Sequence, residues 1–290
     1  MPAILDRRSF LKTVSIGAAA LATFPAGAAR SEKPFRVALL SDTHIPANAA
    51  DVFRGQNMVD NLKRITPEVV AMKPELVMID GDAARLEGKV EDYQALSNLL
   101  QPINAVAPVC MNLGNHDDRA NFNTVFKASA GEKQNVTGKN VLVLEHEHVR
   151  FIVLDSLMYT NKVAGQLGKA QREWLAKYLP TVKDKPVVLF VHHTLENEDG
   201  DLVDVDPLFA ALSRNKHVKA IFYGHSHMWK ITERQRVKLI NLPAVAYPFN
   251  DQEPIGWVEA SFHRKGVDLT MRAFAGKTAD NGKTFNVKWA

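Results

Sequence analysis

Five short apolar segments of this chain each end in a cluster of aspartate, asparagine and histidine residues. The segments have the length and β-branched content of buried strands, and they lie at 35–41, 75–79, 108–113, 187–191 and 218–223. Segments with a helical spacing of apolar residues alternate with them, which predicts an α/β fold. Ligands of open α/β sheets bind at the carboxyl ends of strands, so we expect the five clusters to converge in one place.

The same periodicity predicts the other elements. Helices are expected at 57–72, 91–100, 119–128 and 170–179. We expect Pro67 to break or kink the first of these helices. Asp206 and Pro207 predict a further helix, with Asp206 as its N-cap. Strands are expected at 141–145, 150–155, 230–233, 238–242, 257–262 and 267–272. The strands at 141–145 and 150–155 are expected to form a hairpin. Asn281-Gly282 predicts a turn that folds the polar tail back as a small ribbon.

Composition excludes several classes of protein. The chain of 290 residues contains a single Cys, so no internal disulfide can hold the fold, which must depend on a buried core. The formal net charge is only +4, and the sequence lacks the clustered basic face that nucleic-acid binding requires. Neither internal repeats nor low-complexity linkers interrupt the pattern, which favours a single domain.

Residues 1–29 resemble a twin-arginine signal peptide. The paired Arg7 and Arg8 precede the sequence Phe-Leu-Lys, and an uncharged stretch rich in Ala and Gly follows at 13–29. The tripeptide Ala-Gly-Ala at 26–28 has the pattern of a signal-peptidase site. The resemblance implies export of the folded protein by the twin-arginine machinery, to the periplasm or beyond. An uncleaved anchor, or a cleavage point shifted by one or two residues, is the alternative.

The five clusters consist of residue types that bind metal ions. Their carboxylate, carboxamide and imidazole groups suit Fe, Mn and Zn, and no thiolate or thioether accompanies them. Asp42 and His44 lie two residues apart on an extended backbone and can bind one ion together. His225 and His227 have the same spacing, but a turn between them can direct each to a different ion. Asp82 has two carboxylate oxygens and can bridge two ions.

The order of the clusters resembles the calcineurin-like metallophosphoesterase family. The family pattern is D-x-H, G-D, G-N-H-[DE], a His after a strand, and G-H-x-H, and all five motifs occur in order within residues 34–274. The resemblance implies a four-layer sandwich of two mixed β-sheets flanked by helices, in a single domain at 34–274. The sequence itself indicates a polar tail at 275–290. The resemblance also implies two metal ions, the first bound by Asp42, His44, Asp82 and His227, and the second by Asp82, Asn115, His192 and His225.

Two further residues, His116 and Asp117, have expected roles other than metal binding. The resemblance implies that His116 stays off the metals as the catalytic histidine. Asp117 either caps the helix that begins at Arg119 or orients His116, or does both. The sequence Gly-Asn-His-Asp-Asp-Arg at 114–119 is similar to the branch of class III cyclic-nucleotide and glycerophosphodiester phosphodiesterases.

Other polar residues near the motifs have more than one interpretation. Arg85 and Arg119 can each reach a phosphate oxygen or lie in solvent. His193 follows an expected ligand, and it is expected to pack or to support that ligand. The stretch 196–206 holds six acidic residues and no basic one, which predicts a solvated acidic loop. Such a loop would repel polyanions if it lay beside the metals.

The sequence therefore predicts an exported phosphoesterase with two Fe, Mn or Zn ions that hydrolyses phosphodiesters. The resemblance implies that a hydroxide bridging the two ions attacks phosphorus, while protonated His116 donates a proton to the leaving oxygen. A phosphomonoesterase with the same centre, and a non-catalytic periplasmic protein that binds metal or phosphate, are the alternative functions. The expected partners are a small-molecule phosphoester substrate and the export machinery, and no nucleic acid.

Overall fold

In the computed structural model, which describes residues 33–127 and 129–290, the strands form two mixed β-sheets. The predicted signal at 1–29 lies outside the described residues. The first sheet consists of β1 (Phe35–Ser41), β2 (Leu76–Asp80), β3 (Val109–Asn112), β11 (Pro254–His263), β12 (Gly266–Gly276) and β13 (Thr284–Lys288). Its order is β13-β12-β11-β1-β2-β3, and β1, β2 and β3 are parallel. The predicted ribbon is confirmed, because β13 pairs antiparallel with β12.

The second sheet is built from the middle of the chain. It consists of β4 (Glu132–Lys133), β5 (Leu142–Glu145), β6 (Arg150–Val153), β7 (Val187–Phe190), β8 (Val218–Tyr223), β9 (Lys230–Arg234) and β10 (Val237–Asn241). Its order is β4-β5-β6-β7-β8-β10-β9, and β6, β7, β8 and β10 run parallel. The hairpin of β5 and β6 is confirmed. Sequence periodicity did not predict β4, since its two residues are exposed and polar.

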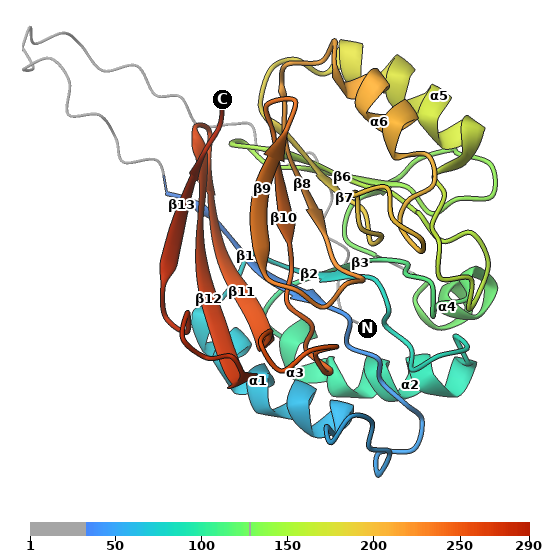
Figure 1. Ribbon diagram of the computed structural model, residues 1–290, viewed down its shortest axis with the longest axis vertical. Helices are drawn as coiled ribbons and strands as arrows, with labels where there is room; N and C mark the ends of the chain where they lie inside the picture. Colours follow the sequence, from blue (N-terminus) through green and yellow to red (C-terminus); the bar gives the residue numbers. More distant parts are fainter. Residues whose placement is uncertain (1–32, 128) are drawn as a thin grey trace, which may run out of the picture. The chain divides into compact units, whose positions relative to one another are not determined.

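Helices cover the outer face of each sheet, so the predicted four-layer α/β sandwich is confirmed (Figure 1). The helices beside the first sheet are α1 (Met58–Met72), α2 (Val90–Leu99), α3 (Gln101–Asn104) and α4 (Arg119–Val125). Those beside the second sheet are α5 (Gly168–Tyr178), a 3-10 turn (Leu179–Thr181) and α6 (Val205–Leu212). In the described part of the chain, no helix is both long and apolar enough to cross a membrane.

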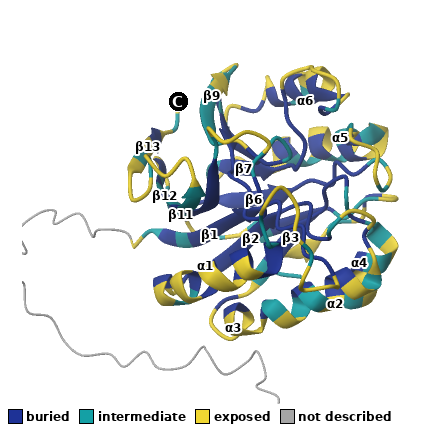
Figure 2. Cartoon of the chain, turned by 60° about the horizontal axis from the view of Figure 1, so that its bottom comes forward, coloured by how far each residue is buried: buried dark blue, intermediate teal, exposed yellow. Residues whose placement is uncertain are grey.

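Strand β1 shows how the layers are packed. Val37 and Leu39 point between the two sheets, whereas Ala38 and Leu40 point toward the helices of the first sheet. Successive side chains of a strand face opposite sides, so a strand that is buried on both faces is apolar throughout. Figure 2 shows the same pattern, with buried strands in the middle and exposed residues on the outer faces of the helices.

Two details of the predicted helices are corrected. Of the break or kink expected at Pro67, the break is wrong, because α1 is continuous from Met58 to Met72. Pro67 is exposed, and the helix buries apolar residues on both sides of it, which offsets the lost backbone hydrogen bond. The N-cap of α6 is Asp204 rather than Asp206, which lies in the first turn.

Asp117 joins the loops that follow β2 and β3. One carboxylate oxygen accepts hydrogen bonds from the backbone N–H groups of Gly114 (2.8 Å) and Ala83 (3.2 Å). The other accepts from the N–H of Ala84 (3.1 Å) and the Tyr93 hydroxyl (3.0 Å). These four donors fill the acceptor positions of the carboxylate. Asp117 therefore holds together the two loops that carry the second and third polar clusters.

Both roles expected for Asp117 are corrected by this arrangement. The N-cap of α4 is Asp118, whose carboxylate accepts the N–H of Asn121 at 2.9 Å. The carboxylate of Asp117 is occupied by the loop donors, so it does not orient His116. Residue spacing could not distinguish Asp117 from Asp118, because the two adjacent aspartates precede the helix equally well.

Asp117→Asn should destabilise the protein, because an amide NH₂ replaces an oxygen that accepts two buried hydrogen bonds. Each buried donor left unpaired costs about 1–3 kcal/mol, so we expect the free energy of unfolding to fall by about 2–6 kcal/mol. Urea denaturation of the metal-free protein measures this change. Asp118→Asn is the matched control, since Asn caps helices as well as Asp does. Equal unfolding free energies for the two variants would contradict the role of Asp117.

Candidate metal centre

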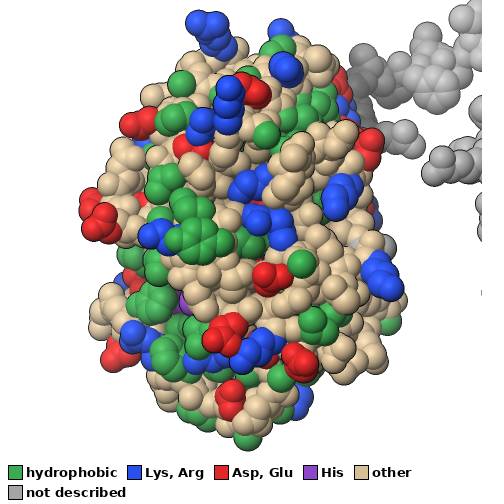
Figure 3. Space-filling view, turned by 90° about the vertical axis from the view of Figure 1, so that its right-hand side faces the viewer, with side chains coloured by type: hydrophobic (Ala, Val, Ile, Leu, Met, Phe, Trp, Pro, Cys, Tyr) green, Lys and Arg blue, Asp and Glu red, His purple; other side chains and the backbone are tan. Residues whose placement is uncertain are grey.

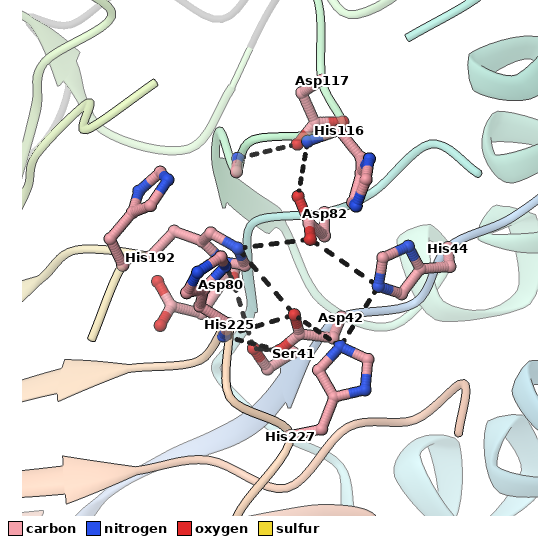
Figure 4. A network of polar contacts seen from close by, with 12 residues as sticks. Ser41, Asp42, His44, Asp80, Asp82, His116, Asp117, His192, His225 and His227 are labelled. Carbon is pink, nitrogen blue, oxygen red and sulfur yellow. Dashed lines mark hydrogen bonds and ion pairs between the residues drawn. The ribbon is translucent and has the colours of Figure 1, made fainter. Parts of the chain in front are cut away.

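The five polar clusters meet where the carboxyl ends of both sheets adjoin (Figure 4). The first sheet contributes the residues that follow β1, β2 and β3, and the second contributes those that follow β7 and β8. The convergence predicted from the strand pattern is therefore confirmed. In Figure 4 the imidazole rings point inward toward two aspartates, Asp42 and Asp82.

Two groups of side chains can each hold a metal ion. The first consists of Asp42, His44 and His227, and the second of Asp82, His192 and His225. Within each group the potential ligand atoms lie within 4.8 Å of one another. One oxygen of Asp82 faces both groups, because Oδ2 lies 3.6 Å from His44 Nε2 and 3.4 Å from His192 Nε2. Asp82 thus occupies the position from which a carboxylate can bridge two ions.

Backbone carbonyls orient three of these histidines. His44, His192 and His227 each direct Nδ1 at a carbonyl oxygen, so that Nδ1 carries the proton and Nε2 faces the centre. The carbonyls belong to Arg85 (3.2 Å), Asp80 (2.8 Å) and Tyr247 (2.5 Å), respectively. Metal-binding histidines in proteins are usually held by such a second hydrogen bond. Sequence spacing could not identify these partners, since any residue can supply a carbonyl.

The charge states of the two groups suit cations. Burial would raise the pKa of Asp42, but His227 and His192 lower it to about 2. Burial acts in the same direction on Asp82, but the charge of His192 holds the pKa of that carboxyl well below its usual range. Burial lowers the pKa of His44 to about 3, so its ring is neutral.

The His192 ring differs in charge from the neutral ring of His44. Burial alone would lower the pKa of His192, but Asp82 and Asp42 raise it to about 10. In the protein without metal, the His192 ring is therefore protonated, with Nε2 3.4 Å from Asp82 Oδ2 and 3.8 Å from Asp42 Oδ1. A cation that binds to His192 must displace a proton from the ring, which couples metal binding to pH.

Two buried atoms support a metal centre independently of the groups themselves. Asn115 Oδ1 and His192 Nε2 are buried, and neither has a hydrogen-bond partner among the described residues. A buried polar atom without a partner is costly, and both atoms are of types that bind metal ions. A cation at the second group would satisfy His192 Nε2, and Asn115 follows Gly114, which lies against Asp82 and His192 of that group. The residues present therefore fit two cations with oxygen and nitrogen ligands.

The backbone bends sharply at the candidate ligands. Five of them have positive φ angles, between 44° and 68°, and these are Asp42, His44, Asp82, His225 and His227. This conformation costs non-glycine residues roughly 1–3 kcal/mol each and collects at functional sites. The adjacent Gly114 has no room for a side chain, because a Cβ there would collide with Asp82 and His192. The chain is thus strained and closely packed where the ligands turn inward.

His116 lies beside the centre but belongs to neither group. Its ring centroid is 5.4 Å from that of His44, and its backbone N–H donates to Asp82 Oδ1 at 2.8 Å. Its Nδ1 lies 3.1 Å from the Leu86 carbonyl oxygen and 2.9 Å from Asn161 Oδ1. Both partners are acceptors, so Nδ1 carries a proton, and any further proton of the ring is on Nε2.

Asn161 is a residue of the site that sequence analysis missed. Its side chain contacts His116, and its backbone N–H donates to the Asn115 carbonyl at 2.7 Å. It lies in the irregular segment between β6 and α5, with a φ angle of 64°. Asn tolerates this conformation better than most residues, but an Asn in a loop is too common to indicate a site.

The two arginines considered from the sequence are engaged in the fold. Arg119 makes a bidentate ion pair with the buried Asp155, at 2.6 and 2.9 Å, and also donates to the Leu157 carbonyl. The guanidinium of Arg85 lies over the Phe53 ring, 4.5 Å from its centroid. The prediction that each arginine either reaches phosphate or is solvated is therefore wrong for Arg119, because burial of Asp155 requires a charged partner.

His193 packs behind the second group, as expected. Its Nδ1 hydrogen-bonds the Ser156 hydroxyl at 2.7 Å, and its ring lies 4.8 Å from that of His225. The ring is buried, and burial holds its pKa well below the usual value. His193 is therefore a neutral ring that supports a candidate ligand.

The acidic stretch 196–206 lies beside the second group, because the Gly200 carbonyl is 3.1 Å from His225 Nε2. This contact leaves His225 Nδ1 to face the centre. We predicted a solvated loop, but basic side chains from other elements pair with its carboxylates. These ion pairs are Glu196 with Lys230, Asp204 with Arg172, and Asp206 with Arg234. Local sequence could not show them, because the partners lie 28 to 34 residues away.

Comparison with known proteins is consistent with this geometry. A probable cyclic nucleotide phosphodiesterase of Ruthia magnifica is 26% identical over 78% of this chain and 93% of its own length. The glycerophosphodiester phosphodiesterase GpdQ of Enterobacter lignolyticus is 26% identical over 63% of this chain and 68% of its own length. The crystal structure of a dimetal phosphatase from Danio rerio shares the fold, with a TM-score of 0.69 at 14% identity, over 89% of this chain and all of that one.

The family model of calcineurin-like phosphoesterases matches residues 35–229, which include all five polar clusters. This match covers more than half of the chain and agrees with the resemblance seen in the motifs. Together with the two ligand groups, it establishes the class of the protein. The chain belongs to the calcineurin-like phosphoesterase family and is a metal-dependent phosphoric ester hydrolase.

Proposed function

We propose that this protein hydrolyses phosphodiesters at a centre of two metal ions. The observation that carries the proposal is the pair of facing ligand groups, with Asp82 Oδ2 directed at both. Relatives that are named cyclic nucleotide phosphodiesterase and glycerophosphodiester phosphodiesterase support a diester as the substrate.

The ligand groups determine how the ions would be held. Asp42, His44 and His227 would bind one ion, and the second group would bind the other with Asn115. Asp82 would bridge them. When bound, Fe, Mn or Zn ions would lower the pKa of water, supply hydroxide as the nucleophile and stabilise negative charge on the phosphoryl oxygens.

His116 would handle the proton of the leaving group. Leu86 and Asn161 hold its Nδ1–H, so Nε2 is the nitrogen that gains or loses a proton. In its doubly protonated form the ring can donate from Nε2 to the departing oxygen, since an alkoxide is a poor leaving group. Asn161 and Leu86 would fix the direction of that donation. A protein that only bound metal or phosphate would not require a ring held in this way.

The test of this function compares two aryl phosphates on the protein loaded with Mn²⁺ or Zn²⁺. We expect faster turnover of bis(4-nitrophenyl) phosphate than of 4-nitrophenyl phosphate, measured by nitrophenolate release. Preference for the monoester would support the phosphomonoesterase instead, and absence of turnover would support the binding protein.

Asp82→Ala should lose both ions and all activity, because one carboxylate faces both groups. Elemental analysis measures the ions. Asp92→Asn, which changes a buried carboxylate of α2, is the control.

His116→Ala should leave the metal content largely intact, because His116 belongs to neither ligand group. Turnover should fall on the order of 10²–10⁴-fold, the usual contribution of a positioned acid–base group. The loss should be greatest for alkyl diesters and smallest for nitrophenyl esters, whose leaving group needs little protonation. Steady-state kinetics across a leaving-group series measures this trend. Equal losses for all leaving groups would show that His116 acts by positioning or charge rather than as an acid.

We also propose export through the twin-arginine route, on the basis of the sequence of residues 1–29. Arg7→Lys combined with Arg8→Lys should retain the protein in the cytoplasm, because the export machinery recognises the arginine pair. Cell fractionation and N-terminal sequencing of the mature chain measure location and cleavage. Export of the double variant, with cleavage near residue 28, would refute this route.

A further inference from the structure

Two exposed aromatic rings lie beside the first ligand group. Phe249, which is 50% exposed, stacks on the His227 ring with centroids 4.2 Å apart and an angle of 21°. Phe53, which is 38% exposed, packs edge-on against Tyr247 at 4.9 Å. Tyr247 in turn stacks on His44 at 5.0 Å. Single exposed apolar residues are common, but these two rings are joined through stacked rings to candidate metal ligands.

A tight turn holds Phe53 in place. The backbones of Phe53 and Gln56 exchange two hydrogen bonds of 2.9 Å around Arg54 and Gly55. Both central residues have positive φ angles, 51° and 73°, which are those of a type I′ turn. Arg54 also donates to the Phe249 carbonyl at 3.4 Å, which ties the two segments together. We call Phe53, Arg54 and Phe249 the aromatic wall.

The aromatic wall is positively charged, in contrast to the other side of the centre. The guanidinium carbon of Arg54 lies 5.7 Å from the Phe53 ring centroid and 5.3 Å from that of Phe249. Arg85 adds a second cation over Phe53. On the side of His225, by contrast, lies the acidic stretch 196–206. In Figure 3 a small area of histidine is visible in a recess of this face, next to hydrophobic side chains, with both basic and acidic side chains farther out. An anionic ligand with an apolar part is therefore favoured at the wall.

We propose that the aromatic wall binds the base of a nucleotide phosphoester while the phosphate lies at the ligand groups. This inference rests on the proposed function and narrows its substrate class. Nucleobases stack on aromatic rings and on guanidinium planes, which are the groups that the wall exposes. A glycerol group has no planar face and gains nothing from such a surface. The wall therefore favours nucleotides over glycerophosphoesters, although relatives of both kinds exist.

The test measures equilibrium binding, so it does not depend on turnover. Isothermal titration of the metal-loaded protein compares adenosine 5′-monophosphate with glycerol 3-phosphate, two monoesters that present the same phosphate. Assay of inorganic phosphate verifies that neither is hydrolysed during the titration. We expect the nucleotide to bind about 10–100-fold more tightly, the range that stacking of one base supplies. Equal affinities in the wild type would overturn the proposal.

Variants then locate the source of the preference. Phe53→Leu and Phe249→Leu retain apolar volume but remove the aromatic face, and each should reduce the affinity ratio of the two ligands several-fold. Tyr178→Leu, which removes an aromatic ring stacked on Trp174 in α5, is the matched control and should leave the ratio unchanged. Thermal unfolding and metal content verify that each variant is folded and loaded. An unchanged ratio in both Phe variants would overturn the role of the wall.

The outcomes separate this inference from the proposed function. A protein that prefers the nucleotide in binding but does not hydrolyse diesters would refute the phosphodiesterase and retain the wall. A protein that hydrolyses diesters but binds both monoesters equally would retain the phosphodiesterase and refute the wall.

Discussion

Burial of two carboxylates among imidazole rings is the constraint on which the rest of the structure depends. Asp42 and Asp82 are almost completely removed from solvent, and isolated charges in such a place would be very unfavourable. Ser41 donates to Asp42 at 2.5 Å, the backbone N–H of His116 donates to Asp82, and histidines lie within 4 Å of both. Removal of one partner would leave a buried charge unpaired, so the site and the fold around it are stable only together.

The same constraint accounts for the form of the loops. The ligands follow strands of two different sheets, so the backbone must turn sharply after each strand to bring them together, and several non-glycine residues adopt positive φ angles there. Strain of this kind persists only where the surroundings enforce it. Asp117 supplies part of that enforcement, since its four hydrogen bonds join the loops after β2 and β3. A carboxylate beside a metal centre can therefore serve the fold rather than the chemistry.

The two ligand groups differ in the type of side chain that surrounds them. The first group adjoins aromatic rings and arginines, whereas the second adjoins a loop of carboxylates. Lys and Arg side chains from other elements partly neutralise the loop. His116 lies beside both groups, and Asn161 and the Leu86 carbonyl contact its ring, so the direction of the ring is set before a ligand arrives.

The sequence by itself determined the strands, their alternation with helices and the convergence of the polar clusters, because strand periodicity and polar residues at strand ends are local signals. It also carried the family motifs, and with them the expected ligand types. Only the tertiary structure decided that Asp118 rather than Asp117 caps α4, that Arg119 pairs with Asp155, and that Asn161 holds His116. The last two contacts join residues that are 36 and 45 positions apart in the chain. The cap is local, but the two adjacent aspartates suit it equally well, and the fold uses Asp117 to join the loops.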